Sequence, residues 1–356
     1  MAIRVLIVED SLTVRKYLCE ILAGHADIEV VGEAQDGKQA IELCHSLKPD
    51  VVTMDMMLPV MTGLGATEYI MAHCPTPILI VSSSTNRGEL FKTYEALAAG
   101  ALDVLDKPSG EEADAAWEQK FVSTIRLISR VRVITHPRAR LAGFGREPVP
   151  RRERQAYTVT PGRHLITIGA STGGPAALVE IMRTLPAPFP LPLLLVLHIA
   201  EPFGAAFAEW LDGQTSHRVT FAREGERVEQ TAGRVVMAPP DRHLVVRERR
   251  LHLTHDAERH SCRPSVDVLF ESVAREYGAA AVGCLLTGMG RDGAAGLLAL
   301  RKARGLTIAR DEASSIVYGM AREAVLLGAA ALVLPLAEIG PTLHAIAADR
   351  REAHRS

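Results

Sequence analysis

Cysteine is scarce in this sequence and follows no pattern. Only five of the 356 residues are cysteine, an odd number, and no two of them form a C-x-x-C pair. The five are Cys19, Cys44, Cys74, Cys262 and Cys284. This spacing excludes a disulfide framework, gives no zinc-binding signature, and is typical of a protein from a reducing cytoplasm.

Strong net charge and long apolar runs are also missing. The formal net charge is −2, so charge gives no reason to expect nucleic acid as a partner. The longest apolar stretch, LPLLLVLHIA, is interrupted by proline and histidine and falls short of the ~20 residues that span a bilayer. The N-terminal MAIRVLIVED lacks the apolar region and the cleavage site of a signal peptide. We therefore expect a cytoplasmic protein without a nucleic-acid partner and without membrane insertion.

What the sequence does contain is an alternation of apolar, strand-like runs with helix-like stretches. In residues 1–122 the strand-like runs are RVLIVED, IEVVGEA, DVVTMDM, PILIVSS and ALDVLDKP. Strands that alternate with helices form parallel sheets through βαβ units. These residues therefore predict a doubly wound, flavodoxin-like α/β domain with a five-stranded sheet.

Residues 123–162 differ in composition from what precedes and follows them. They are rich in arginine, proline and glycine, which is typical of a linker. A basic arm that binds nucleic acid is the alternative, but no DNA-reading helix accompanies it. From residue 163 to residue 350 the alternation resumes, and HLVVRERRLHLTH indicates an antiparallel hairpin. This part predicts a second doubly wound, mostly parallel α/β domain.

Charged and hydroxyl side chains follow the predicted strands of the first domain. Glu9 and Asp10 follow the first strand, Asp55 the third, Ser82 the fourth and Lys107 the fifth. In an open parallel sheet these strand ends meet at one edge, where grouped carboxylates favour a bound Mg²⁺. An aspartate can form a phosphoryl-enzyme, so Asp55, at the centre of the group, is the candidate phosphate acceptor. The alternative is that each acid only caps the helix that follows it.

The motifs VED, DMMLP, VSS and DKP, in this order, resemble the receiver domain of bacterial response regulators. The resemblance implies that a partner histidine kinase phosphorylates Asp55, with Mg²⁺ held by Glu9, Asp10 and Asp55. It also implies that Ser82 and Lys107 contact the phosphoryl group. Glu9 departs from the family pattern, in which an aspartate is commoner at this position.

The second domain opens with a glycine-rich turn, IGASTGGP, after its first strand. A dinucleotide-binding turn requires glycine where Ser171 stands, and an acid at the end of the next strand, where His198 stands. A Walker-type phosphate loop requires a lysine that this turn lacks. The remaining interpretation is a strand-to-helix turn that exposes Ser171 as a nucleophile, since GASTG satisfies G-x-S-x-G.

A serine nucleophile needs a general base, and the base needs a carboxylate that orients it. His198 ends the next strand, and Asp292 lies in the glycine turn of CLLTGMGRDGAAG. Ser171, His198 and Asp292 thus follow three strands whose ends face one crevice. Structural roles are the alternative: Ser171 and Asp292 as helix caps, and His198 as an ordinary edge residue.

The motifs GASTGGP, LHI, APPDRHL, RPSVDVLF, LTGMGRDGA and DEASSIVYGM resemble the catalytic domain of the CheB family of chemotaxis protein-glutamate methylesterases. The resemblance spans nearly the whole chain and implies a catalytic triad of Ser171, His198 and Asp292, with Thr172 and Met289 lining the oxyanion and substrate pocket. It implies hydrolysis of glutamate methyl esters and deamidation of glutamines on methyl-accepting chemoreceptors, in chemotactic adaptation, without a cofactor for the esterase reaction. We expect a chemotaxis histidine kinase as phosphodonor and a monomeric protein.

A group of histidines and one cysteine near the predicted hairpin are further candidates. His252, His255, Asp256 and His260 are close in the sequence, where a metal site competes with an exposed polar hairpin. Cys262 has no base near it in the chain and is expected to be inert. Two other functions stay open at this point: a second domain that only binds a partner, and a hydrolase of small esters or amides.

Overall fold

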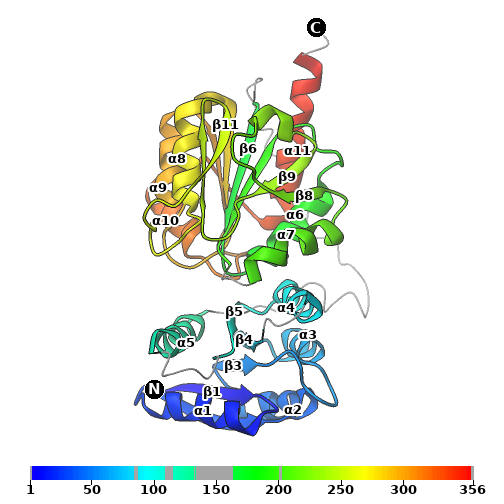
Figure 1. The fold of residues 1–356 in the computed structure, drawn as a ribbon, viewed down its shortest axis with the longest axis vertical. Coiled ribbons are helices and arrows are strands. Elements are labelled where there is room, and N and C mark those ends of the chain that lie inside the picture. The colour runs from blue at the N-terminus through cyan, green and yellow to red at the C-terminus, as the bar shows by residue number, and fades with distance from the viewer. Residues whose placement is uncertain are drawn as a thin grey trace. The chain divides into compact units, whose positions relative to one another are not determined.

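The chain folds into two compact units, Met1–Gly143 and Phe144–Ser356, each with its own sheet and core (Figure 1). The computed structural model describes residues 2–83, 87–108, 115–131, 133, 163–199 and 203–353. Most of the expected linker, residues 134–162, therefore lies outside the described residues.

The first unit is a parallel sheet with strand order β2-β1-β3-β4-β5. Its elements are β1 (Ile3–Val8), α1 (Leu12–Ala23), β2 (Ile28–Ala34), α2 (Gly37–Leu47), β3 (Val51–Met54), α3 (Gly63–His73), β4 (Ile78–Ser82), α4 (Arg87–Ala99), β5 (Asp103–Asp106) and α5 (Ala115–Ile128). Helices α1 and α5 contact each other, while α3 contacts both α2 and α4. The apolar strands are buried between these helices, which confirms the predicted doubly wound domain.

Helix α3 begins directly beside the end of β3, and a capping threonine followed by a glycine allows this. Thr62 Oγ1 accepts a hydrogen bond from the Gly65 N–H at 3.2 Å, a cap typically worth ~1 kcal/mol. A Cβ added to Gly63 would collide with the carbonyl oxygen of Asp55. Glycine at this position therefore lets the helix pack against the loop that carries Asp55.

Helix α5 runs across the position where the linker was expected to begin. It runs over Ala115–Ile128, so the domain boundary expected at residue 122 falls inside the helix. Phe121, Val122, Ile125 and Ile128 are all buried. Because these apolar side chains recur at helical spacing, they keep the helix packed on the sheet beyond the expected boundary.

The second unit contains a seven-stranded parallel sheet with strand order β14-β13-β12-β6-β7-β9-β8. Its elements are β6 (Leu165–Ala170), α6 (Gly174–Thr184), β7 (Leu193–Leu197), α7 (Phe203–Gln214), β8 (Arg218–Phe221), η2 (Val228–Thr231), β9 (Arg234–Met237), β10 (His243–Arg247), β11 (Arg250–Thr254), α8 (Val266–Tyr277), η3 (Gly278–Ala280), β12 (Ala281–Leu285), α9 (Ala294–Lys302), β13 (Leu306–Arg310), α10 (Met320–Leu326), β14 (Leu332–Leu334) and α11 (Leu336–Ala353). The parallel sheet and the antiparallel β10-β11 pair are both as the sequence predicted.

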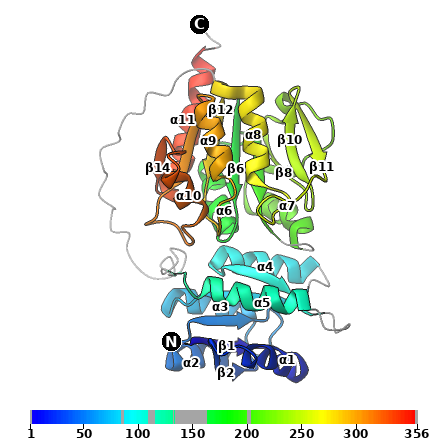
Figure 2. The ribbon, with the colours of Figure 1, turned by 90° about the vertical axis from the view of Figure 1, so that its left-hand side faces the viewer.

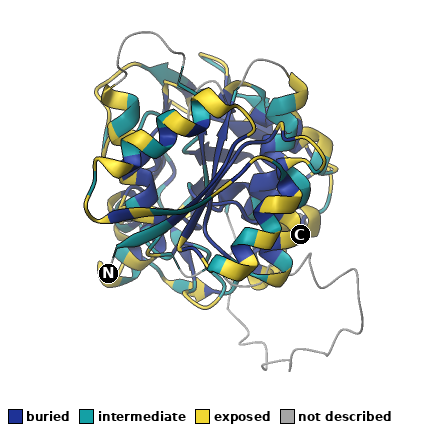
Figure 3. Ribbon diagram, turned by 90° about the horizontal axis from the view of Figure 1, so that it is seen from below, coloured by how far each residue is buried: buried dark blue, intermediate teal, exposed yellow. Residues whose placement is uncertain are grey.

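Helices cover both faces of this sheet (Figures 1 and 2). Helix α9 packs between α8 and α10 on one face, where α8 also contacts β10, and α6 packs against α11 on the other. One continuous apolar core joins β6 and β12 to α8 and α9, and it includes Leu165, Phe270, Leu285 and Leu297. Figure 3 shows the strands as buried ribbons between helices with exposed outer sides. Among the described residues, no helix combines the length and apolar character that crossing a membrane requires.

Candidate active site and phosphorylation site

Three polar residues lie at the carboxyl ends of neighbouring strands in the second unit. Strand β6 pairs with β7 on one side and with β12 on the other. Ser171 follows β6, His198 follows β7, and Asp292 lies in the loop after β12. Connections leave the central strand toward opposite sides here, which is where open α/β sheets form a crevice for ligands.

Two backbone hydrogen bonds hold these strand ends together. The His198 N–H donates to the Ala170 carbonyl at 3.0 Å, and the Ser171 N–H donates to the Thr287 carbonyl at 2.8 Å. The second bond brings Gly288 against Ser171, so closely that a Cβ on Gly288 would lie 2.6 Å from Ser171 Cβ. Glycine is therefore required for the β12 loop to reach the candidate nucleophile.

Asp292 is the most strongly held residue of the site. His198 Nε2 lies 2.8 Å from its Oδ2, and the Asp292 side chain is only 2% exposed. The carboxylate also accepts hydrogen bonds from Ser265 Oγ at 2.8 Å and from the backbone N–H groups of Val266 and Asp267 at 2.7 and 3.1 Å. These donors form the N-terminus of α8, where the helix dipole favours a negative charge. Asp292 thus binds the start of α8. It does not cap α9, which was the structural alternative considered from the sequence.

The charges of this pair follow from its contacts. Burial raises the pKa of Asp292, but the hydrogen bonds from His198 and Ser265 outweigh it and hold the pKa below its ordinary value. Burial lowers the pKa of His198, but its contacts with Asp292 and Cys262 outweigh that effect and raise the pKa to about 9. Because Nε2 faces an ionised carboxylate, we assign the ring proton to Nε2, which leaves Nδ1 to accept a second proton.

Cys262 is a site residue that sequence reasoning missed. Its Sγ lies 3.7 Å from His198 Nδ1 and 3.3 Å from the His260 carbonyl oxygen. The expectation of an inert thiol rested on the lack of a base nearby in the chain, whereas the fold brings in a base 64 residues away. Ser265 was missed as well, because its sequence signal is that of a helix cap and says nothing of its second bond, to Asp292.

The surroundings of Ser171 leave its hydroxyl available. Among the described residues, this hydroxyl makes no hydrogen bond, and the backbone N–H groups of Thr172 and Met289 donate none. The Thr172 carbonyl accepts from Thr287 Oγ1 at 2.9 Å, which fixes the turn after β6. Gly173, at a φ of 74°, then starts α6 in the left-handed region that favours glycine. The turn therefore presents a hydroxyl with unpaired N–H donors close by.

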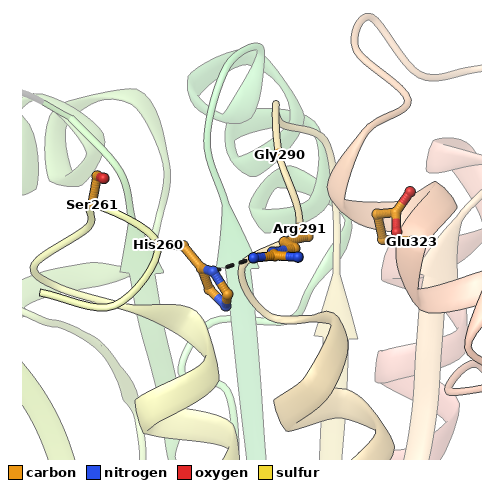
Figure 4. A pocket seen from close by; sticks show the side chains of 5 residues that line it. All are labelled: His260, Ser261, Gly290, Arg291 and Glu323. Atoms are coloured by element: carbon orange, nitrogen blue, oxygen red, sulfur yellow. Dashed lines mark hydrogen bonds between the residues drawn. The ribbon is translucent and has the colours of Figure 1, made fainter.

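A pocket of about 480 Å³ opens beside this site (Figure 4). It is lined by His260, Ser261, Gly290, Arg291 and Glu323. Arg291 Nε points at His260 Nδ1 at 3.4 Å, while Glu323 stands on α10 at the other side. Two of the loops that line the pocket also carry Cys262 and Asp292, so the pocket adjoins these residues and offers both a positive and a negative side chain.

The histidines near the hairpin do not come together. His252 Nδ1 lies 2.8 Å from Glu224, His255 Nδ1 lies 4.0 Å from Asp241, and His260 Nε2 lies 3.2 Å from Asp267. Each of these three histidines has its own acidic partner. The structure therefore does not support a metal site made of His252, His255, Asp256 and His260.

In the first unit, the predicted acidic pocket is assembled around Asp55. Ligand oxygens of Glu9, Asp10 and Asp55 all lie within 4.8 Å of one another. Lys107 Nζ lies 3.0 Å from Asp55 Oδ2 and 3.0 Å from Glu9 Oε1. Ser82, fully buried, ends the neighbouring strand β4, and its carbonyl accepts from the Lys107 N–H at 3.1 Å. All five residues predicted for this site thus lie at one edge of the sheet.

The electrostatics of this pocket fit a divalent cation. Burial and the neighbouring Asp55 carboxylate raise the pKa of Glu9 to about 7, despite the hydrogen bond from Lys107. Asp55 Oδ1 is buried without a hydrogen-bond partner among the described residues. An oxygen left in this state, beside two further carboxylates, is the kind of ligand that Mg²⁺ binds.

The chain thus joins a unit with a carboxylate pocket around Asp55 to a unit that brings a serine, a histidine and an aspartate to neighbouring strand ends. The model of the CheB methylesterase family matches residues 166–343, and that of the response regulator receiver domain matches residues 5–114. The protein-glutamate methylesterase/protein-glutamine glutaminase of Nitrosospira multiformis is 43% identical over 98% of this chain and 98% of its own length. The chain therefore belongs to the CheB methylesterase family, which confirms the predicted family and enzyme class.

A second curated relative and one solved structure are also similar to this chain. Protein-glutamate methylesterase/protein-glutamine glutaminase 2 of Anaeromyxobacter dehalogenans is 43% identical over 95% of each chain. Among solved structures, the crystal structure of the Thermotoga maritima CheB methylesterase catalytic domain is 32% identical, with a TM-score of 0.49, and covers 52% of this chain and 98% of that chain.

Proposed function

We propose that this protein is a phosphorylation-regulated serine hydrolase of methyl-accepting chemoreceptors, acting in the cytoplasm. It removes methyl groups from glutamate methyl esters and deamidates glutamines, the two activities named in its relatives. The observation that carries the proposal is the 2.8 Å contact between His198 Nε2 and Asp292 Oδ2, at the strand end next to Ser171. Methanol release from methylated receptors tests it, and activity on small free esters alone contradicts it.

The proposed reaction assigns a role to each nitrogen of His198. Nδ1 of the neutral ring takes the proton of the Ser171 hydroxyl as Oγ attacks the ester carbonyl carbon. The protonated ring then donates this proton to the methoxide oxygen, so methanol leaves and a glutamyl ester forms on Ser171. A water molecule, deprotonated by Nδ1, attacks that ester and releases glutamate and free Ser171. Asp292 stays ionised throughout and stabilises the charged ring.

The negative oxygen of the tetrahedral intermediate needs hydrogen-bond donors. The backbone N–H groups of Thr172 and Met289 are unpaired among the described residues and flank Ser171 through its own turn and through Gly288. Donors that are fixed before the reaction stabilise such an oxyanion, and loss of one typically costs ~10²-fold or more in rate. In this proposal, Thr172 and Met289 contribute these backbone groups to the oxyanion and substrate pocket.

The pH dependence of the reaction follows from His198. Its pKa is raised to about 9, and only the neutral ring can accept the serine proton. We expect kcat/KM for a methylated receptor peptide to rise by about tenfold per pH unit from neutral pH and to level off near pH 9. A profile already flat at pH 7 contradicts this assignment. Since the raised pKa stabilises the folded state only while the ring is charged, this contribution to stability is lost as pH rises through about 9.

The first unit supplies the regulation. We propose that Asp55 accepts a phosphoryl group from a chemotaxis histidine kinase, with Mg²⁺ held by Glu9, Asp10 and Asp55. Bound there, Mg²⁺ supplies positive charge that offsets the phosphoryl and carboxylate oxygens. Lys107 already contacts the acceptor carboxylate and can pair with a phosphoryl oxygen, and the Ser82 hydroxyl can donate to another. Phosphorylation is proposed to relieve inhibition of the esterase by the first unit.

Replacing the acceptor should abolish this control. In Asp55→Asn, a phosphodonor should no longer raise esterase activity, because an amide oxygen forms no acyl phosphate. Asp50→Asn is the matched control, since that exposed aspartate accepts from the Arg4 N–H at 2.8 Å, at the start of β3. Methanol release with and without a small-molecule phosphodonor measures the effect. Full stimulation of Asp55→Asn, or a chain lacking residues 1–150 that is as slow as the unphosphorylated protein, contradicts the proposal.

A further inference from the structure

Cys262 introduces a soft metal ligand beside the triad. A nitrogen of His198, Sγ of Cys262 and a carboxylate oxygen of Asp292 all lie within 4.8 Å of one another. His198 is 15% exposed on its side chain and Cys262 is partly exposed, so an ion can reach them from solvent. Thiolate sulfur with imidazole nitrogen is a donor set that suits Zn²⁺.

The separation of the two donors fits a single ion. Zinc lies about 2.3 Å from thiolate sulfur and about 2.0–2.1 Å from imidazole nitrogen, so tetrahedral geometry places the two ligand atoms roughly 3.6 Å apart. Cys262 Sγ and His198 Nδ1 are 3.7 Å apart. The observed separation therefore matches that of two ligands on one zinc ion.

Asp292 occupies the position that supports a metal-binding histidine. Such histidines usually donate their other N–H to a carboxylate, which fixes the ring and makes the metal-facing nitrogen more basic. His198 does this through Nε2, and the remaining capacity of Asp292 is taken by Ser265, Val266 and Asp267. Asp292 thus orients His198 rather than binding the metal itself.

We propose that Zn²⁺ binds His198 Nδ1 and Cys262 Sγ and inhibits the esterase reversibly. Binding releases to solvent the thiol proton of Cys262 and, below about pH 9, the second ring proton of His198. It occupies the Nδ1 lone pair that would take the proton of Ser171. Two protein ligands leave the other coordination positions to water, so chelators can remove the ion. The inhibition rests on the proposed function, whereas the binding does not.

Cobalt absorption tests the binding without any enzyme assay. Co²⁺ replaces Zn²⁺ at such sites, and coordination by a thiolate adds a sulfur-to-cobalt charge-transfer band. The full-length protein should show this band with Co²⁺ and lose it in Cys262→Ser, Cys262→Ala and His198→Ala. Cys74→Ala, at a partly buried cysteine of the first unit whose Sγ lies 3.9 Å from that of Cys44, should retain it. A band that persists without Cys262, or one that Cys74→Ala removes, overturns the proposal.

Inhibition is then measured as methanol release against buffered free Zn²⁺. The rate of each variant with zinc is divided by its own metal-free rate, so a change in basal activity does not affect the comparison. The zinc concentration for half-inhibition should rise by at least about tenfold in Cys262→Ser and stay unchanged in Cys74→Ala. Equal inhibition of the full-length protein and Cys262→Ser overturns the proposed regulation. If the protein proves inactive on receptors, the cobalt result still shows whether His198 and Cys262 bind a metal ion.

Discussion

Ser171→Ala should lower kcat for receptor demethylation by about 10⁴–10⁶-fold. In the proposed mechanism this hydroxyl forms the acyl-enzyme, and the methyl group of alanine can neither attack the ester nor be activated by His198. Ser171 is joined to its neighbours through backbone bonds, since its N–H donates to the Thr287 carbonyl at 2.8 Å. Removing one oxygen should therefore leave the fold and the KM close to those of the unsubstituted protein.

Ser216→Ala is the matched control for this measurement. Ser216 is exposed in the loop between α7 and β8, so its loss should leave the rate of methanol release unchanged. Thermal unfolding of both variants separates loss of chemistry from loss of fold. A Ser171→Ala protein that keeps more than about one-hundredth of the rate contradicts a serine nucleophile.

Asp292→Asn should lower kcat by about 10⁴-fold, the second largest effect that we expect. An amide nitrogen donates to His198 Nε2, which moves the ring proton to Nδ1 and removes the base that the proposed mechanism assigns to that nitrogen. The same substitution takes a negative charge from the N-terminus of α8, where Ser265 and two backbone N–H groups bind it. We therefore expect a loss of roughly 1–3 kcal/mol in the free energy of unfolding.

Asp212→Asn separates the two effects of that substitution. Asp212 Oδ1 accepts from the Val219 N–H at 2.7 Å, so this control alters a structural carboxylate without touching His198. Its kcat should stay near that of the unsubstituted protein in the same methanol assay, and urea unfolding gives the stability of both variants. An Asp292→Asn protein with a kcat within tenfold of the control contradicts a catalytic role for the carboxylate.

The sequence predicts well which residues lie at the strand ends, because the carboxyl ends of parallel strands all lie at the same edge of the sheet. Once β6, β7 and β12 are recognised as buried apolar runs, Ser171, His198 and the turn that holds Asp292 must fall at the same edge. The same reasoning places Asp55 and Lys107 together in the first unit. The apolar helix positions beyond residue 122 are present in the sequence too, but the change in composition suggested a domain boundary there, at a position inside α5.

The sequence does not predict contacts that depend on how long loops fold back. Cys262 meets His198, and Ser265 meets Asp292, only because the chain between β11 and α8 passes over the carboxyl end of the sheet. Neither residue belongs to a motif whose spacing encodes the partner. The proposed zinc site is therefore visible in the structure, although the sequence alone predicted neither a metal site nor a reactive thiol there.

Mass spectrometry of receptor glutamates after incubation in ¹⁸O-water tests the central claim most directly. Hydrolysis through an acyl-enzyme on Ser171 breaks the bond between the acyl carbon and the methoxy oxygen. Each demethylated glutamate should then carry one ¹⁸O, the released methanol should carry none, and Ser171→Ala should leave the methyl esters intact. The assignment of this site is contradicted if the unsubstituted protein leaves the receptor methyl esters intact. It is also contradicted if Ser171→Ala hydrolyses them equally fast.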